Sequence, residues 1–271
     1  MMTVTEQEHA PAGVDPAVPS VARIYDYLLG GKDNFASDRE AAAQILRLSP
    51  NAKEVARANR AFMGRAVRAI ARKGVRQFLD IGTGLPTQEN VHQVAAQVAP
   101  GTRVVYVDND PIVLVHARAL LAETADTIVV EGDMREPKAI LTHPEILQHL
   151  DLRRPTAVLL MAVLHFIPDD DQVRDILRIV REALPSGSYL VISHVTEGRL
   201  DGRAVGAGRE VYRRTSTGNV TPRSREVIAG FFDGLEMVEP GLVSATAEDA
   251  LDASVAGPGG ADVLCGIGRI P

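Results

Sequence analysis

Short apolar runs recur between residues 75 and 194, and segments with helical spacing separate them. Apolar side chains return every three or four positions over 91–98 and again over 173–184, as on one face of a helix. The alternation predicts an α/β fold in which helices cover both faces of a parallel sheet. The runs are rich in Val, Ile and Leu, as strands buried on both faces are, and they span 75–81, 103–107, 127–131, 157–163 and 188–194.

The region before the first run predicts helices. A capping serine precedes a helix that we expect to end at residue 29, and 52–74 carries an apolar stripe that ends at a glycine. Between these two, Ser37 and Glu40 have the spacing of a capping box for another helix. The first 19 residues contain three prolines and no apolar stretch, which indicates a disordered tail rather than a signal peptide.

The pattern after the fifth run is less regular. Residues 196–218 are rich in Gly and Arg and predict a mobile loop, and 244–261 predicts an exposed linker. A Thr-Pro pair at 221–222 resembles an N-cap followed by the first helical position, so we expect a helix over 222–232. Two further strands are expected over 235–243 and 262–269.

Composition narrows the classes of protein. The 271 residues are 45% hydrophobic, enough for a full core, and no apolar run approaches the ~18 residues of a membrane span. The net charge of −6 does not favour nucleic acid as a partner, and no membrane partner is expected. Cys265 is the only cysteine, which excludes an internal disulfide and fits a cytoplasmic location.

A glycine-rich turn after the first strand carries the strongest chemical signal. Asp80 ends the strand, Gly82, Thr83 and Gly84 follow, and a helix is expected from about Thr87. Glycines let the backbone approach a ligand closely, and a helix N-terminus favours negative charge. The same turn could serve only as a tight connection.

Acids at the next two strand ends strengthen the ligand-binding interpretation. Asp108 and Asn109 end the second strand, 24 residues beyond Gly84, where an acid can accept both hydroxyls of a ribose. Asp133 and Met134 end the third strand and offer an acceptor for an adenine amino group and a surface for its ring. Ligands of open α/β sheets bind at these strand ends.

A nicotinamide-dependent oxidoreductase is the competing interpretation. Its fingerprint requires a third glycine where this chain has Thr87, preceded by Pro86, and no tyrosine has a lysine four residues later. The Asp-x-Gly-x-Gly turn with a later aspartate at the third strand fits S-adenosylmethionine better.

Longer stretches resemble one family. The bacterial S-adenosylmethionine-dependent methyltransferases long known only as a domain of unknown function are similar to this chain over about 18–243 and the closing strand. The resemblance rests on SVARIYDYLLGGKDNF, ANRAFMGRAVR, FLDIGTGLPTQENVHQVA, VVYVDNDPIVLVHARALL, EGDMREP and AVLLMAVLHFIPD. Members often carry a tryptophan-bearing stretch after PGLV, and 244–261 has none.

The resemblance implies a Rossmann-like class I methyltransferase with a seven-stranded, mostly parallel sheet whose last strand is antiparallel. It divides the chain into a tail (1–19), an N-terminal helical cap (20–74) and an S-adenosylmethionine-binding domain (75–271). It also implies that Gly82 and Gly84 flank the methionine part of the cofactor, and that Ala162 and His165 face the methyl group. The expected cofactor-binding set is Tyr25, Lys32, Asn34, Arg60, Asp80, Gly82, Thr83, Gly84, Asp108, Asn109, Asp133, Met134 and Ala162.

Residues 30–32, Gly-Gly-Lys, look like a phosphate-binding loop, but a helix precedes them and Asp33 follows the lysine. We interpret them as a helix exit with positive φ. Lys32 or Arg60 could then pair with the cofactor carboxylate. The alternative is a capped helix end with a solvent-facing lysine.

Catalytic residues are harder to identify, because methyl transfer needs mainly orientation. His165 and His194, at the ends of the fourth and fifth strands, are candidate bases, or histidines bonded to backbone. Residues 212–214, Tyr-Arg-Arg, could line a pocket for a small-molecule acceptor or form a solvated helix face. No metal site is expected. A cofactor-binding sensor without turnover remains an alternative function.

Overall fold

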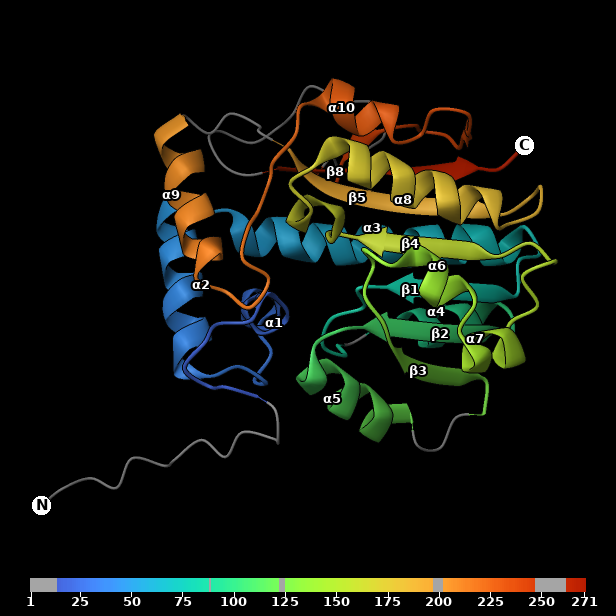
Figure 1. Cartoon of the computed structure of the whole chain (residues 1–271), viewed down its shortest axis with the longest axis horizontal. Coiled ribbons are helices and arrows are strands. Elements are labelled where there is room, and N and C mark those ends of the chain that lie inside the picture. The colour runs from blue at the N-terminus through green and yellow to red at the C-terminus, as the bar shows by residue number, and fades with distance from the viewer. Residues whose placement is uncertain (1–13, 88, 122–124, 197–201, 247–261) are drawn as a thin grey trace, which may run out of the picture.

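The computed structural model describes residues 14–87, 89–121, 125–196, 202–246 and 262–271 (Figure 1). Its strands are β1 (Gln77–Ile81), β2 (Arg103–Asp108), β3 (Thr127–Glu131), β4 (Ala157–Met161), β5 (Tyr189–Thr196), β6 (Glu236–Met237), β7 (Val243–Ser244) and β8 (Asp262–Arg269). Its helices are α1 (Val21–Leu29), α2 (Ala36–Leu48), α3 (Ala52–Arg72), α4 (Val91–Val98), α5 (Pro111–Leu121), α6 (Pro137–Leu141), α7 (Pro144–His149), the 3₁₀ helix η1 (Leu164–Phe166), α8 (Asp170–Glu182), α9 (Gly202–Arg213) and α10 (Arg225–Gly230).

The strands form one sheet in the order β3-β2-β1-β4-β5-β8-β6, and the short β7 pairs with β8. Strands β1 to β5 are parallel, and β8 is antiparallel to β5, as the sequence and the family resemblance predict. The strand order reverses between β1 and β4. Ligands bind at such a switch point, outside the carboxyl ends of the strands.

Alternate side chains of the strands supply two separate cores. Leu79, Val105 and Val158 belong to the cluster on the face that α8 covers. Phe78 and Leu159, one residue away on the same strands, belong to the cluster that includes α3 and α4 on the other face. Figure 1 shows α8 in front of the sheet and α3 behind it. This period of two is what buried strands require.

A third apolar cluster joins the N-terminal helices to α9. Ile24 and Leu28 of α1 pack with Ile45 of α2 and Val211 of α9, and the cluster stands beside the carboxyl edge of the sheet (Figure 1). The prediction of a loop over 196–218 is therefore wrong for 202–213, which is helical. Its Gly and Arg content carries little helical signal, and Val211 holds the helix by tertiary contact.

Three other predictions need correction. The α2 helix begins at Ala36, and the Phe35 N–H donates to the Asp38 carboxylate at 2.8 Å, so the box of Ser37 and Glu40 does not form. The α10 helix begins at Arg225 after the Ser224 cap, since the residues before it bond to η1 and β5. The strand expected over 235–243 is two short strands, β6 and β7.

Two predicted irregular segments are described only in part. Residues 1–13 and 247–261 lie outside the described residues. Residues 14–19 lie against the helical cap, where the Ser37 hydroxyl donates to the Pro16 carbonyl at 2.6 Å. Within the described ranges, no helix combines the length and the apolar character that a membrane crossing requires.

Candidate functional site

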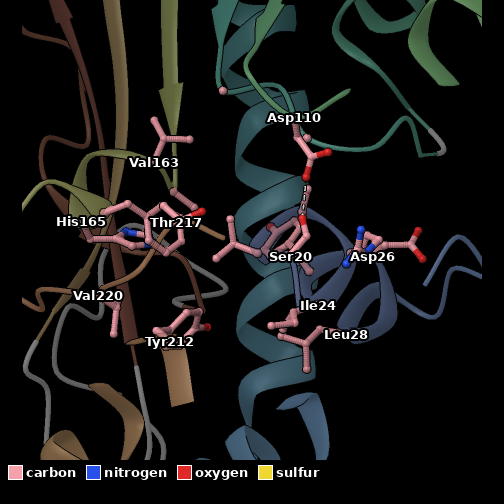
Figure 2. A pocket seen from close by; sticks show the side chains of 18 of the residues that line it. Ser20, Ile24, Asp26, Leu28, Asp110, Val163, His165, Tyr212, Thr217 and Val220 are labelled. Carbon is pink, nitrogen blue, oxygen red and sulfur yellow. Dashed lines mark hydrogen bonds between the residues drawn. The ribbon is translucent and has the colours of Figure 1, made fainter. Parts of the chain in front are cut away.

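A cavity of about 630 Å³ lies at the carboxyl ends of β1 to β4. One side is formed by the turns that follow these strands, and the other by α1, α2, α3, η1 and α9. Its volume falls within the ~300–1,000 Å³ that is usual for small-molecule sites. Figure 2 shows Ser20, Ile24 and Leu28 on one wall and His165, Tyr212 and Val220 on the opposite wall.

The glycine turn after β1 requires glycine for two different reasons. Both Gly82 (φ 72°) and Gly84 (φ 68°) adopt left-handed backbone conformations. A Cβ on Gly82 would also clash with Val163 Cγ1, whereas one on Gly84 would meet open space. The turn therefore packs closely against the residues that follow β4. Gly84 presents its backbone, with no side chain, to the cavity.

Three carboxylates from consecutive strands line the cavity. Burial raises the pKa of Asp80 to about 6, and the Thr83 hydroxyl donates to this carboxylate at 2.9 Å. Burial also raises the pKa of Asp108. Arg135 donates hydrogen bonds to Asp133 and thereby holds the pKa of that carboxyl below its usual range.

Backbone donors fix the Asp108 carboxylate but leave acceptor capacity. One oxygen accepts from the Gly84 N–H at 2.9 Å and the other from the Asp110 N–H at 2.9 Å. The two carboxylate oxygens together offer about four acceptor positions, so the group can still accept a hydroxyl donor. Together with Asn109 and Met134, which also line the cavity, this set suits an adenosine with a cationic amino acid tail.

The chain after β4 is strained where it meets the cavity. Ala162 has φ 55°, which non-glycine residues rarely adopt, and Ser193 holds its N–H through both its carbonyl (3.1 Å) and its hydroxyl (2.8 Å) oxygens. This turn leads into η1 and brings Ala162 and His165 to the cavity wall.

His165 is 7% exposed and its ring is bonded to β5. The Val195 N–H donates to His165 Nδ1 at 3.4 Å. Burial, and then His194 and Arg223, lower the pKa of His165 well below its usual range, so this side chain is neutral at pH 7.

His194 is fully buried and does not line the cavity. Its Nδ1 donates to the Val195 carbonyl at 2.7 Å, and its Nε2 accepts from Arg223 Nη1 at 2.9 Å. Burial lowers its pKa to about 4. With both ring nitrogens occupied, His194 has a structural role, and the structure does not bring this predicted catalytic candidate to the site.

Arg223 is a residue that the sequence did not single out. It is 3% exposed, and its guanidinium donates to Asp170 (2.6 Å) and to the Ile167 carbonyl (2.8 Å) as well as to His194. It thereby joins η1, α8 and β5. No sequence signal marks it, because its partners are distant in the chain.

The N-terminal candidates divide into two groups. Tyr25 and Arg60 line the cavity, where the Tyr25 hydroxyl donates to the Ala56 carbonyl at 3.1 Å and Arg60 Nη2 donates to the Thr87 hydroxyl at 2.6 Å. Lys32 is exposed, whereas Asn34 is buried and its Nδ2 donates to Asp26 Oδ2 at 2.9 Å. Neither residue lines the cavity. Gly30 ends α1 in the left-handed conformation (φ 89°), as predicted.

An apolar arm extends the cavity away from the strand ends. We use this name for the part lined by Ile24, Leu28, Ile45, Leu48, Phe166, Val205 and Tyr212. Arg213 and Arg214 do not line it, since both pair with Glu210 on the exposed side of α9.

The N-terminal segment is tied across the cavity. The Ser20 hydroxyl donates to Asp110 Oδ2 at 2.6 Å, which links α1 to the start of α5 (Figure 2). A buried ion pair between Arg23 and Asp38 (2.7 Å) holds α1 to α2. Within the described residues, no group of three or more His, Cys, Asp or Glu side chains is placed to hold a metal ion.

Comparisons with known proteins agree with this geometry. The family profile described as S-adenosyl methyltransferase matches residues 7–271. The crystal structure of a DUF574 family protein from Streptomyces avermitilis MA-4680 is 42% identical, with a TM-score of 0.86 over 95% of this chain and 99% of that chain. That of a proposed methyltransferase from Thermobifida fusca YX is 40% identical, with a TM-score of 0.86 over 96% and 98%.

More distant relatives share the fold alone. An O-methyltransferase family protein from Burkholderia thailandensis is 15% identical, with a TM-score of 0.50 over 87% of this chain and 60% of that chain. A comparison with curated protein sequences gave no match. The family profile and the two similar structures confirm the resemblance found in the sequence. The chain therefore belongs to the S-adenosyl methyltransferase family and is an S-adenosylmethionine-dependent methyltransferase.

Proposed function

We propose that this enzyme methylates a small molecule that binds in the same cavity as the cofactor. The observation that carries the proposal is the meeting of two unlike regions in one cavity. Acids line it at three consecutive strand ends, and the apolar arm lies beside His165, whose ring contacts Phe166. A site of this kind can hold a polar cofactor and an apolar reactant next to each other.

Each polar residue at the strand ends has a proposed role toward the cofactor. Asp108 accepts the ribose hydroxyls, and Asp133 with Met134 holds the adenine. Asp80 accepts from the amino group of the methionine part, and Arg60 pairs with its carboxylate. Lys32 and Asn34 keep only an indirect role, since both follow the α1 exit and neither lines the cavity.

When bound, S-adenosylmethionine supplies an activated methyl group on a sulfonium sulfur. The protein's part is to orient two reactants and to exclude water. Ala162 and His165 line the cavity where the chain leaves β4, and the methyl group is proposed to face them. The α1 helix, held by Ser20 and Arg23, covers the cavity opposite them.

Binding of the cofactor tests the assignment. Asp108→Ala should weaken the affinity for S-adenosylmethionine by about 1.5–3 kcal/mol, or roughly 10- to 150-fold, as expected for hydrogen bonds to a charged group. Asp151→Ala, which changes a partly exposed aspartate outside the cavity, is the control and should leave calorimetric affinity unchanged. Tight binding of a nicotinamide dinucleotide with none of S-adenosylmethionine would contradict the proposal.

Turnover separates an enzyme from a sensor. With cell extract as the source of acceptors, we expect S-adenosylhomocysteine to accumulate along with a labelled methylated product. Binding without any consumption would favour a regulatory protein instead. We also propose a cytoplasmic location, which the single, buried Cys265 supports.

A further inference from the structure

The ring of His165 has a defined tautomer, and that tautomer restricts the acceptor. We propose that the apolar arm binds a molecule with an apolar body and an ionised oxygen, a carboxylate or a phenolate. The Nε2–H of His165 donates a hydrogen bond to that oxygen. This inference rests on the function proposed above and replaces the sequence-based expectation that His165 is a base.

The end of β4 sets the tautomer. The β4 strand stops at Met161 whereas β5 continues to Thr196, so the Val195 N–H has no strand partner on the β4 side. His165 Nδ1 accepts from it at 3.4 Å. A backbone N–H can only donate, so Nδ1 carries no proton, and a neutral ring then has its proton on Nε2. A flipped ring would place a carbon against Val195 and leave its N–H unpaired.

The Nε2 atom is directed at the cavity. Among the described residues it has no hydrogen-bond partner. The Nε2 atom is also accessible to solvent. Among the described residues, His143 Nδ1 is the only side-chain nitrogen or oxygen that is both buried and without a partner, so an unpartnered Nε2 of His165 is not buried. Since His165 lines the cavity, its exposed nitrogen meets the cavity and offers a proton rather than a lone pair.

A donor at this position selects the reacting atom. An amine or a ring nitrogen has a single lone pair, which cannot both accept the Nε2–H and attack the methyl group. An ionised oxygen has further lone pairs for the attack. The acceptor oxygen contributes the electron pair of the new C–O bond, and the pair of the broken C–S bond stays on sulfur. The positive charge of the sulfonium and the negative charge of the acceptor oxygen are both neutralised by the transfer, and no proton has to be removed from the acceptor.

The apolar arm defines the rest of the acceptor. Aliphatic side chains of α1, α2 and α9 line it with the rings of Phe166 and Tyr212. Arg209 lines the cavity from α9, is exposed and forms no ion pair with another described residue, so it favours an anion there. An apolar wall beside the His165 donor and the Arg209 cation suits an aromatic or aliphatic oxyanion better than a sugar or a peptide.

Nitrogen-15 NMR of the whole protein at pH 7 tests the tautomer without any acceptor. We expect His165 to show a protonated Nε2 and a bare Nδ1. His194, whose Nδ1 donates to Val195, is the internal control with the opposite pattern. A protonated Nδ1 on His165 would overturn the proposal.

Product chemistry tests the acceptor class. Labelled S-adenosylmethionine is supplied with the enzyme and a cell extract, and the products are divided into methyl esters or ethers and methylated amines. Label confined to amines would overturn this inference but leave the proposed function standing. Absence of any transfer, with no S-adenosylhomocysteine formed, would defeat both.

Two variants then separate a donor from a base. His165→Gln places an amide N–H near the Nε2 position, and His165→Asn places an acceptor near Nδ1 without reaching the cavity. We expect Gln to retain at least tenfold more transfer than Asn, with a rate that is flat from pH 6 to 8. Equal loss in both, with unchanged S-adenosylmethionine affinity, would indicate a base instead.

Discussion

Replacing Arg223 should destabilise the protein strongly, although this residue lies outside the cavity. The Arg223→Met variant keeps most of the side-chain volume and removes every donor. The buried acceptors left without a partner are the Ile167 carbonyl and Nε2 of His194, whereas the Leu164 carbonyl keeps its bond from the Ile167 N–H at 3.1 Å. The Asp170 side chain is 41% exposed, so water can hydrogen-bond to its carboxylate once Arg223 is gone, and its lost ion pair adds little to the loss of stability.

The magnitude follows from these acceptors. Each buried group left unsatisfied costs about 1–3 kcal/mol, and removal of one partner from a buried charged network costs about 3–5 kcal/mol in other proteins. Because water can reach part of the network beside Asp170, we expect a loss of about 3–5 kcal/mol in the free energy of unfolding. At about 2–4 °C per kcal/mol, the melting temperature should fall by roughly 6–20 °C.

Urea denaturation followed by circular dichroism measures the loss. Arg213→Met is the matched control, since Arg213 is exposed and pairs with Glu210 alone among the described residues, and it should change stability by less than about 0.5 kcal/mol. The double variant Arg223→Met/His194→Phe should lose less than the sum of the single variants, because both partners of one bond are then apolar. A loss below about 1 kcal/mol in Arg223→Met would refute the reasoning.

Three further outcomes are expected. Gly82→Ala should weaken S-adenosylmethionine binding at least tenfold, because the new Cβ would clash with Val163. Gly101→Ala is the control, since Gly101 has a similar φ of 75° but open space around a Cβ. It should keep the calorimetric affinity and lose only about 1 kcal/mol of stability. The pKa of His194 in the folded protein lies below its unfolded value of about 6.5, so its contribution to stability is present above pH 6.5. The free energy of unfolding should therefore fall by about 3 kcal/mol as the pH is lowered toward 4. Denaturation of His194→Gln at each pH should not show this loss. The pKa of Asp80 is raised to about 6, so its ionisation lowers the stability of the folded protein as the pH rises from about 4 to 6. A bound amino group favours the ionised carboxylate, so the affinity for S-adenosylmethionine should rise from pH 5 to 7. An equal rise in Asp80→Asn would contradict this role of Asp80.

The sheet and its ligand edge could be predicted because their signals are local. Strands buried on both faces are continuous apolar runs, and the turn from Asp80 to Gly84 needs glycine for reasons visible in the backbone. Asp108 and Asp133 follow from the rule that parallel strands end at one edge. In contrast, α9 carries a weak helical signal and depends on packing of Val211 against α1 and α2, which no local pattern reports.

The two histidines could not be distinguished from the sequence, since each stands at the end of a buried strand. Their difference comes from contacts at long range. Arg223, 29 residues beyond His194, occupies one nitrogen of that ring, and no described residue reaches Nε2 of His165 in the same way. Lys32 illustrates the same limit, since the sequence left it either at the cofactor carboxylate or facing solvent, and the structure shows it exposed after the turn at Gly30.

The unequal lengths of β4 and β5 account for the chemistry of both rings. Where β4 ends, β5 still presents the Val195 N–H and carbonyl, and buried backbone groups must find partners. The N–H takes His165 Nδ1, and the carbonyl takes His194 Nδ1–H and the Arg223 N–H. The backbone groups of one residue, Val195, thus fix the proton of His165 on Nε2 and that of His194 on Nδ1. The donor that faces the acceptor is therefore a consequence of strand length, and a change in the β4 turn at Ala162 would alter it without any substitution at His165.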